Sequence, residues 1–199
     1  MKESKRDAWI FAGAMIVLLG TALAIKNFTG STPAASSPNV YVGHYGFAVT
    51  LTPLTAARLQ MFGAFTNPEK TSEVVFVFPR DMRSEEVFNV SEARYREYGI
   101  VRMEVNPNKS FPANTDLLAA AKFAVGTTLK EKKEPFSVSD IEEPLPGFVV
   151  DITTPTPLRQ VFLKGQKVHY LITGDPDNPA LREVLDGLAE IAPHDEPGK

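Results

Sequence analysis

The sequence predicts an α+β domain with a mainly antiparallel sheet, preceded by one N-terminal transmembrane helix. Three observations lead to this prediction. The run from Ala8 to Ile25 contains no charged residue. Short β-prone segments separated by glycine and proline then follow one another along the chain. Two longer stretches in the second half of the chain combine helical periodicity with capping residues.

The apolar run is long enough to cross a membrane. As an α-helix, residues 8–25 extend roughly 27 Å, close to the thickness of the hydrocarbon core of a bilayer. Three basic residues precede this run and Lys26 follows it, so the positive-inside rule places residues 1–7 in the cytoplasm and the rest of the chain outside it. We expect a single-pass anchor in the inner membrane with a periplasmic domain. Ala22 and Ala24 leave a second interpretation open, a signal peptide that is cleaved after Ala24.

Composition predicts one domain of ordinary size after the anchor. Residues 26–39 read as a flexible linker, residues 40–192 as a single extracytoplasmic domain, and residues 193–199 as a disordered tail. The chain has no cysteine, which excludes disulfides, a thiol nucleophile and the lipid attachment of a bacterial lipoprotein. With 24 acidic and 21 basic residues the net charge is −3, which argues against a nucleic-acid partner.

Most of the domain is predicted to be β-structure. The expected strands are Val40–Tyr45, Phe47–Leu51, Arg58–Phe65, Glu73–Phe78, Ile100–Val105, Gly147–Thr153, Leu158–Lys164 and Gln166–Ile172. The first two strands are separated at Gly46, residues 58–78 form a predicted hairpin, and the last three strands form a β-meander with Gly165 in the tight connection between the last two. Because residues 74–78 are apolar at every position, we expect that strand to be covered on both faces, which requires a helical layer.

The sequence predicts three helices. Ser91–Tyr98 forms a short one that ends at Gly99. The next begins at a cap, Asn114 or Thr115, and ends at Gly126. The run Lys130–Glu134, whose charges nearly cancel, is expected to be a solvated loop or strand end.

The last helix has the strongest start signal. Asn178 is its predicted cap, with Pro179 in the first turn and Pro193 beyond its end. Its expected apolar stripe consists of Leu181, Val184, Leu185, Leu188 and Ile191. Leu185 is then central in the stripe, and Gly187 lies on the polar face, where alanine should be neutral or slightly stabilising.

Several of these segments together resemble a known family. They are Tyr45–Leu51, the strand Gly147–Thr153, the hairpin Val161–Thr173, and the last helix after Asp175–Asn178. This layout is similar to the PsbP/Mog1-like (DcrB-like) domains of exported bacterial proteins, over roughly residues 40 to 192. The resemblance implies an α/β/α sandwich that acts as an accessory or binding module. It implies no catalytic residues.

The residues themselves offer few signs of chemistry. His44, His169 and His194 lack metal-ligand spacing, and no G-x-S-x-G nucleophile motif occurs. We expect no cofactor and no metal. The cluster Arg94, Tyr95, Arg96 and Tyr98 is the predicted partner-binding surface, although Tyr95 and Tyr98 at this spacing also suit packing on one helix face.

Two functional classes remain open at the level of the sequence. The first is a non-catalytic, membrane-anchored module that binds another protein of the cell envelope. The second is an extracytoplasmic, hydrolase-like enzyme whose site is assembled from distant residues, for instance His44, Asp151 and His169. Whether the chain is an enzyme is not decided by the sequence.

Overall fold

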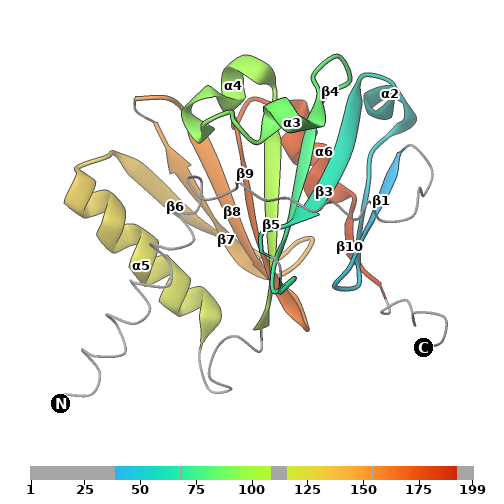
Figure 1. Cartoon of the computed structure of the whole chain (residues 1–199). Coiled ribbons are helices and arrows are strands. Elements are labelled where there is room, and N and C mark those ends of the chain that lie inside the picture. Colours follow the sequence, from blue (N-terminus) through green and yellow to red (C-terminus); the bar gives the residue numbers. More distant parts are fainter. Residues whose placement is uncertain (1–38, 68, 109–115, 154, 192–199) are drawn as a thin grey trace.

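A seven-stranded sheet forms the centre of the molecule, with a second, three-stranded sheet beside it (Figure 1). The computed structural model describes residues 39–67, 69–108, 116–153 and 155–191. The predicted anchor at residues 8–25, almost all of the linker and the tail at 193–199 lie outside these residues. Within them, no helix is long and apolar enough to span a membrane. The chain therefore has a mixed α+β fold dominated by antiparallel structure.

The large sheet is antiparallel throughout, in the order β3-β4-β5-β9-β8-β7-β6. Its strands are β3 (Leu59–Phe65), β4 (Glu73–Pro79), β5 (Val101–Pro107), β6 (Phe136–Ile141), β7 (Gly147–Ile152), β8 (Leu158–Lys164) and β9 (Val168–Gly174). The small sheet, in the order β1-β2-β10, consists of β1 (Val40–Gly43), β2 (Phe47–Thr50) and β10 (Leu188–Glu190).

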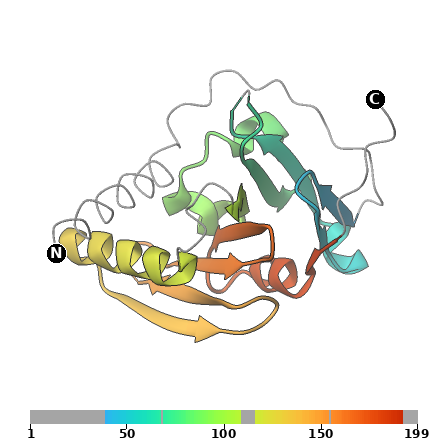
Figure 2. The same ribbon diagram turned by 90° about the horizontal axis from the view of Figure 1, so that it is seen from below.

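The helices divide between the two sides of the large sheet. They are α2 (Pro53–Ala56), α3 (Ser84–Val87), the 3₁₀ turn η2 (Glu92–Arg94), α4 (Tyr95–Tyr98), α5 (Leu117–Lys132) and α6 (Pro179–Asp186). Seen from below, α5 and the small sheet lie at opposite ends of the molecule (Figure 2).

One face of the large sheet, here called the continuous face, carries a single apolar core. Alternate residues of four neighbouring strands, β4, β5, β9 and β8, point to this side, among them Val77, Met103 and Val161. The small sheet and α6 cover them with buried side chains such as Phe47 and Leu181. This core is the largest cluster of the described residues.

The opposite face, here called the divided face, carries two separate apolar cores. Helix α5 packs Ala124, Val125 and Leu129 onto residues of β7, β8 and β9. The short helices α3 and α4 cover the apolar residues of β4, with Val87 and Tyr95 facing inward. Polar side chains of the strands between these two cores separate them.

The predicted hairpins and the meander are confirmed. Residues 59–65 pair with 73–79, and β7, β8 and β9 form consecutive antiparallel pairs. Every residue of β4 except the last is buried, as the apolar run predicts. Gly99 ends α4 in the left-handed region at φ 64°, where glycine has no steric penalty.

Helix α5 is longer than predicted. Asp116, rather than Asn114 or Thr115, is its cap, and the Asp116 Oδ1 accepts a hydrogen bond from the Ala119 N–H at 3.1 Å. The helix continues through Gly126 to Lys132, so the prediction of a loop over Lys130–Glu134 is wrong for the first three residues. The reason is Leu129, which extends the apolar stripe by one turn and is 5% exposed.

The last helix is shorter than predicted. Helix α6 ends at Asp186, and Leu188–Glu190 instead form β10 against β2. Gly187 marks this change: a Cβ atom there would lie 2.0 Å from the Thr50 backbone oxygen. The prediction that Gly187 lies on a polar helix face is therefore wrong. In the apolar stripe of α6, Leu181 and Val184 are buried and Leu185 is only partly buried.

Strand β6 had no counterpart among the predicted strands. Its sequence, FSVSDI, contains two serines and an aspartate, and its exposed residues are Ser137, Ser139 and Asp140. Such a polar sequence is typical of an edge strand rather than of a strand buried on both faces.

Candidate functional site

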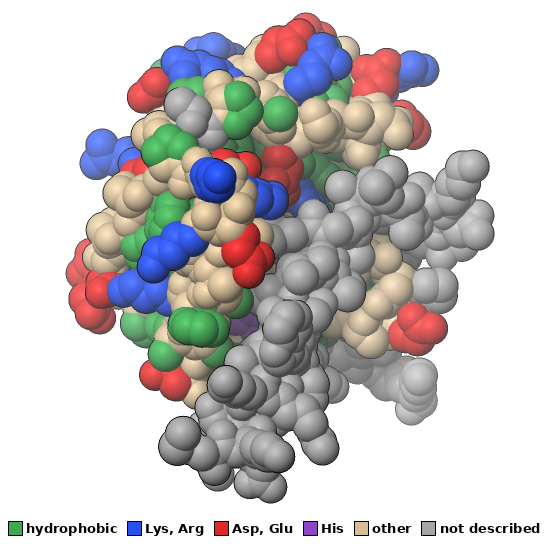
Figure 3. Space-filling model, turned by 90° about the vertical axis from the view of Figure 1, so that its left-hand side faces the viewer, with side chains coloured by type: hydrophobic (Ala, Val, Ile, Leu, Met, Phe, Trp, Pro, Cys, Tyr) green, Lys and Arg blue, Asp and Glu red, His purple; other side chains and the backbone are tan. Residues whose placement is uncertain are grey.

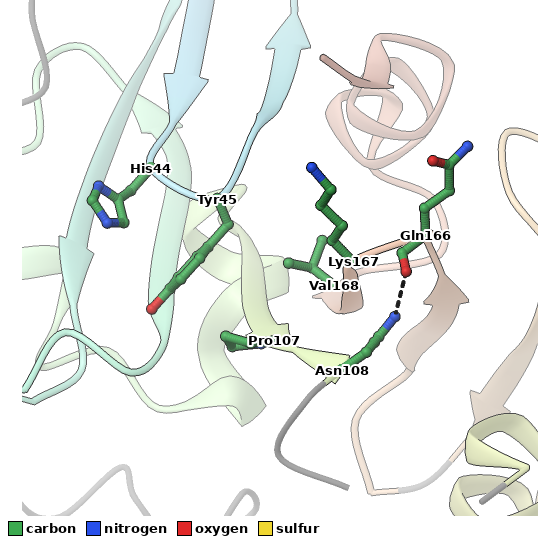
Figure 4. A pocket seen from close by; sticks show the side chains of 7 residues that line it. All are labelled: His44, Tyr45, Pro107, Asn108, Gln166, Lys167 and Val168. Carbon is green, nitrogen blue, oxygen red and sulfur yellow. Dashed lines mark hydrogen bonds between the residues drawn. The ribbon is translucent and has the colours of Figure 1, made fainter. Parts of the chain in front are cut away.

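A cavity of about 490 Å³ opens at one end of the large sheet, on the side of the continuous face. We call it the end cleft. Its lining residues are His44, Tyr45, Pro107, Asn108, Gln166, Lys167 and Val168 (Figure 4). They come from three places in the chain: the β1–β2 turn, the end of β5, and the β8–β9 turn with the start of β9. The end cleft therefore lies where the two sheets meet.

A buried carboxylate holds the β1–β2 turn in place. Glu73, at the start of β4, is 2% exposed. Its Oε1 accepts a hydrogen bond from the Tyr41 hydroxyl, and its Oε2 accepts one from the His44 backbone N–H at 3.0 Å. Burial raises the pKa of Glu73, and these two hydrogen bonds oppose the rise. Because both oxygens have partners, Glu73 positions the turn and is not available to a ligand.

Asn108 holds the opposite wall of the end cleft. Its Nδ2 donates to the Gly165 oxygen at 3.0 Å and to the Gln166 oxygen at 3.3 Å. Its backbone N–H donates to the Lys167 oxygen at 2.8 Å. The Gln166 backbone N–H in turn donates to the Glu190 carboxylate. These bonds tie the β8–β9 turn to both β5 and the small sheet, so the wall is fixed on two sides.

The interior of the end cleft is mainly apolar. The Tyr45 ring lies on one side and Val168 with Pro107 on the other, while the Lys167 side chain extends upward in this view, away from Pro107 and Asn108 (Figure 4). The Tyr45 hydroxyl is engaged in a hydrogen bond to the Lys70 backbone oxygen. An apolar floor beside an ammonium group and amides suits the binding of a ligand that has both an apolar and an anionic part.

His44 contributes to the cleft wall through the packing of its ring and through its backbone N–H, and not through its imidazole nitrogens. Its ring makes edge contacts with Tyr45, at a centroid distance of 5.3 Å, and with Phe65, at 5.2 Å. Figure 4 shows the imidazole turned away from Lys167 and Val168. Its backbone N–H, rather than its ring, makes the hydrogen bond to Glu73. His44 therefore packs beside Tyr45 and supports that ring.

The other two residues of the enzyme hypothesis lie apart from each other. Asp151 points to the continuous face, where it forms a bidentate ion pair with Arg159 at 2.7 and 2.9 Å. His169 points to the divided face, where its Nδ1 lies 3.1 Å from the Asn108 Oδ1. The large sheet separates the two side chains, so His44, Asp151 and His169 do not form one catalytic group.

The predicted partner-binding cluster also divides. Tyr95 is 2% exposed and belongs to the core under α4, so it is not accessible to a partner. Arg94 lies over the Tyr98 ring, 4.6 Å from its centroid, and pairs with Glu97. Arg96 points elsewhere, toward Asp177 at 3.2 Å and Asp175 at 3.6 Å. A contact surface made by Arg94, Arg96 and Tyr98 stays a prediction.

Several residues of the end cleft were missed by sequence reasoning. Glu73 reads as the first residue of an apolar strand, and nothing local indicates that it is buried and bonded to Tyr41. Asn108, Gln166 and Lys167 occur in loops and turns, where polar residues are expected in any protein. Two glycines were usable signals: Gly46 predicted the break between the first two strands, and Gly165 predicted the tight turn between the last two.

No metal centre is found in the part of the chain that the structure describes, because no three His, Asp or Glu side chains there are grouped to hold an ion. The chain matches no model of a known protein family and no curated protein.

Proposed function

We propose that this chain is a membrane-anchored, extracytoplasmic module that binds a segment of another envelope protein in the end cleft without catalysing a reaction. The observation that supports it is the arrangement of the cleft walls. Glu73 and Asn108 are used to fix those walls, whereas Tyr45, Val168 and Lys167 present apolar and cationic surface to the space between them. Such a site is built to hold a ligand in a defined place.

The membrane anchor, the linker and the accessory role in this proposal are predicted from the sequence. Residues 8–25 act as the anchor, with residues 1–7 in the cytoplasm, and the linker of residues 26–39 gives the domain reach from the inner membrane. The PsbP/Mog1-like resemblance, with its α/β/α sandwich, is consistent with α5 on one face of the large sheet and α6 on the other. An accessory role in an envelope complex is the function this resemblance implies.

The residues that line the cleft indicate which kind of peptide segment it can bind. The cleft offers an apolar floor and the ammonium group of Lys167, and Lys70 lies nearby, 5.1 Å over the Phe65 ring. An extended peptide with an apolar residue followed by a carboxylate matches this arrangement.

Site-specific photocrosslinking in native membranes tests the proposal. A photoreactive residue at position 167 should yield an adduct with one envelope protein, whereas the same residue at Lys130, exposed on α5, should not. Lys167→Glu should weaken capture several-fold, because it reverses the charge in the cleft. The proposal fails if positions 167 and 130 give the same adducts.

A further inference from the structure

Strand β6 leaves one edge of the large sheet open. It pairs with β7 on one side, and no described element lies beyond it on the other. The Thr153 backbone N–H donates to the Pro135 oxygen, which fixes the alternation of the antiparallel ladder. Odd-numbered residues of β6 therefore bond to β7. The backbone groups of Phe136, Val138 and Asp140 point outward, away from every described strand.

We propose that β6 pairs with β6 of a second copy of this chain, antiparallel and centred on Val138. A two-fold axis at Val138 places Phe136 opposite Asp140 of the partner and Val138 opposite the partner's Val138. In this register all three outward-facing residues meet outward-facing residues, giving about six inter-chain backbone hydrogen bonds. Shifting the pairing by two residues leaves some of these groups unpaired. The strand is thus complementary to itself in a single best register.

Side chains and flanking charges agree with this pairing. On one face Val138 meets its own copy, and on the other Ser137 meets Ser139 of the partner. Lys132, Lys133 and Glu134 precede β6 with a net charge of +1, whereas Glu142 and Glu143 follow it with a charge of −2. Antiparallel pairing therefore sets the basic end of one strand beside the acidic end of the other. The side of the molecule that carries α5 has both charge signs interspersed, so no single-sign field opposes association there (Figure 3).

The other edge of the sheet is less suited to such pairing. Strand β1 packs on the continuous face of β3, where a Cβ atom on Gly63 would be 1.7 Å from the Tyr41 hydroxyl oxygen, so a strand added at that edge would also have to fit beside the small sheet. Strand β6 carries a single charged side chain, Asp140, which pairs with Lys122 at 2.7 Å. It lacks the lysines, prolines and bulges that protect the edges of monomeric sheets. The dimer is independent of the end cleft, which lies elsewhere on the chain.

Cysteine crosslinking of the full-length chain in detergent tests the register directly, because the natural chain has no cysteine. Ser137 and Ser139 of the partner form a non-hydrogen-bonded pair with Cα atoms about 4.5 Å apart, within the range of a disulfide. In a single variant the two introduced cysteines are diagonal, about 7 to 8 Å apart, and too far for a disulfide. A mixture of Ser137→Cys and Ser139→Cys should therefore crosslink several-fold more than either variant alone.

Two further variants test the pairing without crosslinks. Val138→Pro removes an outward N–H that the single chain does not use, so it should convert dimers to monomers in light-scattering measurements and leave the circular dichroism spectrum unchanged. If that variant misfolds, Ser137→Lys/Ser139→Lys supplies the same test through like-charge repulsion at exposed positions. The proposal is overturned if the natural chain is a monomer at tens of micromolar. Equal crosslinking of mixed and single variants, or dimers that persist in a folded Val138→Pro or lysine variant, also overturns it.

Discussion

The continuous face and the divided face belong to the same strands of the large sheet, but the first carries one apolar core and the second carries two separate cores. On the continuous face, alternate residues of neighbouring strands are apolar from β4 to β8, and one core covers them. On the divided face, Arg102, Thr173 and Gln160 form a row of cross-strand neighbours over β5, β9 and β8. This row separates the core under α5 from the core under α3 and α4.

The polar row of the divided face is buried, and ion pairs compensate its charge so that the strands still pair. Arg102 pairs with Glu104 at 2.5 Å and with Glu92 at 3.0 Å, and only 11% of its side chain is exposed. Burial raises the pKa of Glu104, and the Arg102 guanidinium opposes the rise. The buried charges of Arg102 and Glu104 compensate each other. Removing one of them should therefore lower the free energy of unfolding more than removing one methyl group from an apolar core does.

The largest expected effect is the loss of Arg102. Arg102→Met leaves the buried Glu104 without its main partner and should lower the free energy of unfolding by about 3 to 5 kcal/mol. Urea unfolding followed by circular dichroism measures this loss. In the double variant Arg102→Met/Glu104→Gln the buried carboxylate is gone and only Glu92, whose side chain is 33% exposed, loses its partner, so most of the stability should return. If the single variant loses less than about 1 kcal/mol, the pair is solvated and the contrast between the faces is weaker than described.

The pH dependence of stability gives a second test on the divided face. Burial lowers the pKa of His169 to about 4, below its ordinary value of 6.5. As pH falls below 6.5, the unfolded state takes up a proton before the folded state does. The contribution of His169 is therefore complete above pH 6.5 and is lost as pH falls toward 4, by up to roughly 3 kcal/mol.

His169→Gln removes this titration and keeps a side chain that can contact Asn108. The difference in unfolding free energy between the natural chain and the variant should therefore shift by that amount between pH 7 and pH 4, in favour of the variant at low pH. Glu73 and Glu104, whose pKa values are raised by burial, act in the opposite sense but are present in both proteins. A pH-independent difference would show that His169 is solvated.

The smallest expected effects come from two glycines, one on each face. Gly187→Ala on the continuous face forces a Cβ atom within 2.0 Å of the Thr50 oxygen and should destabilise the chain by about 1 to 3 kcal/mol. Gly126→Ala in α5 meets no atom within 4 Å and should stabilise it by about 0.5 to 1 kcal/mol. Melting temperatures of the two variants should move in opposite directions. Equal shifts would place the end of α6 elsewhere.

Local sequence determined the elements whose signals lie within the element itself. The apolar run of β4, the turn at Gly165, the stop at Gly99 and the Asn178 cap with Pro179 each depend on neighbouring residues, and each is found where the sequence indicates. Half of the end cleft could be predicted from such local signals, since the β1–β2 turn and the β8–β9 turn were both expected. That they face each other across a cavity was not.

Tertiary structure decided what depends on partners distant in the chain. Leu188 is apolar at a spacing that fits helix α6, but pairing with β2 gives residues 188–190 backbone hydrogen bonds as a strand and buries Leu188 there. Glu73 owes its burial to Tyr41 and to the turn at His44, and Asp151 and His169 are separated because they point to opposite faces of one sheet. Periodicity reports which residues are apolar, but strand order and register determine which surfaces meet.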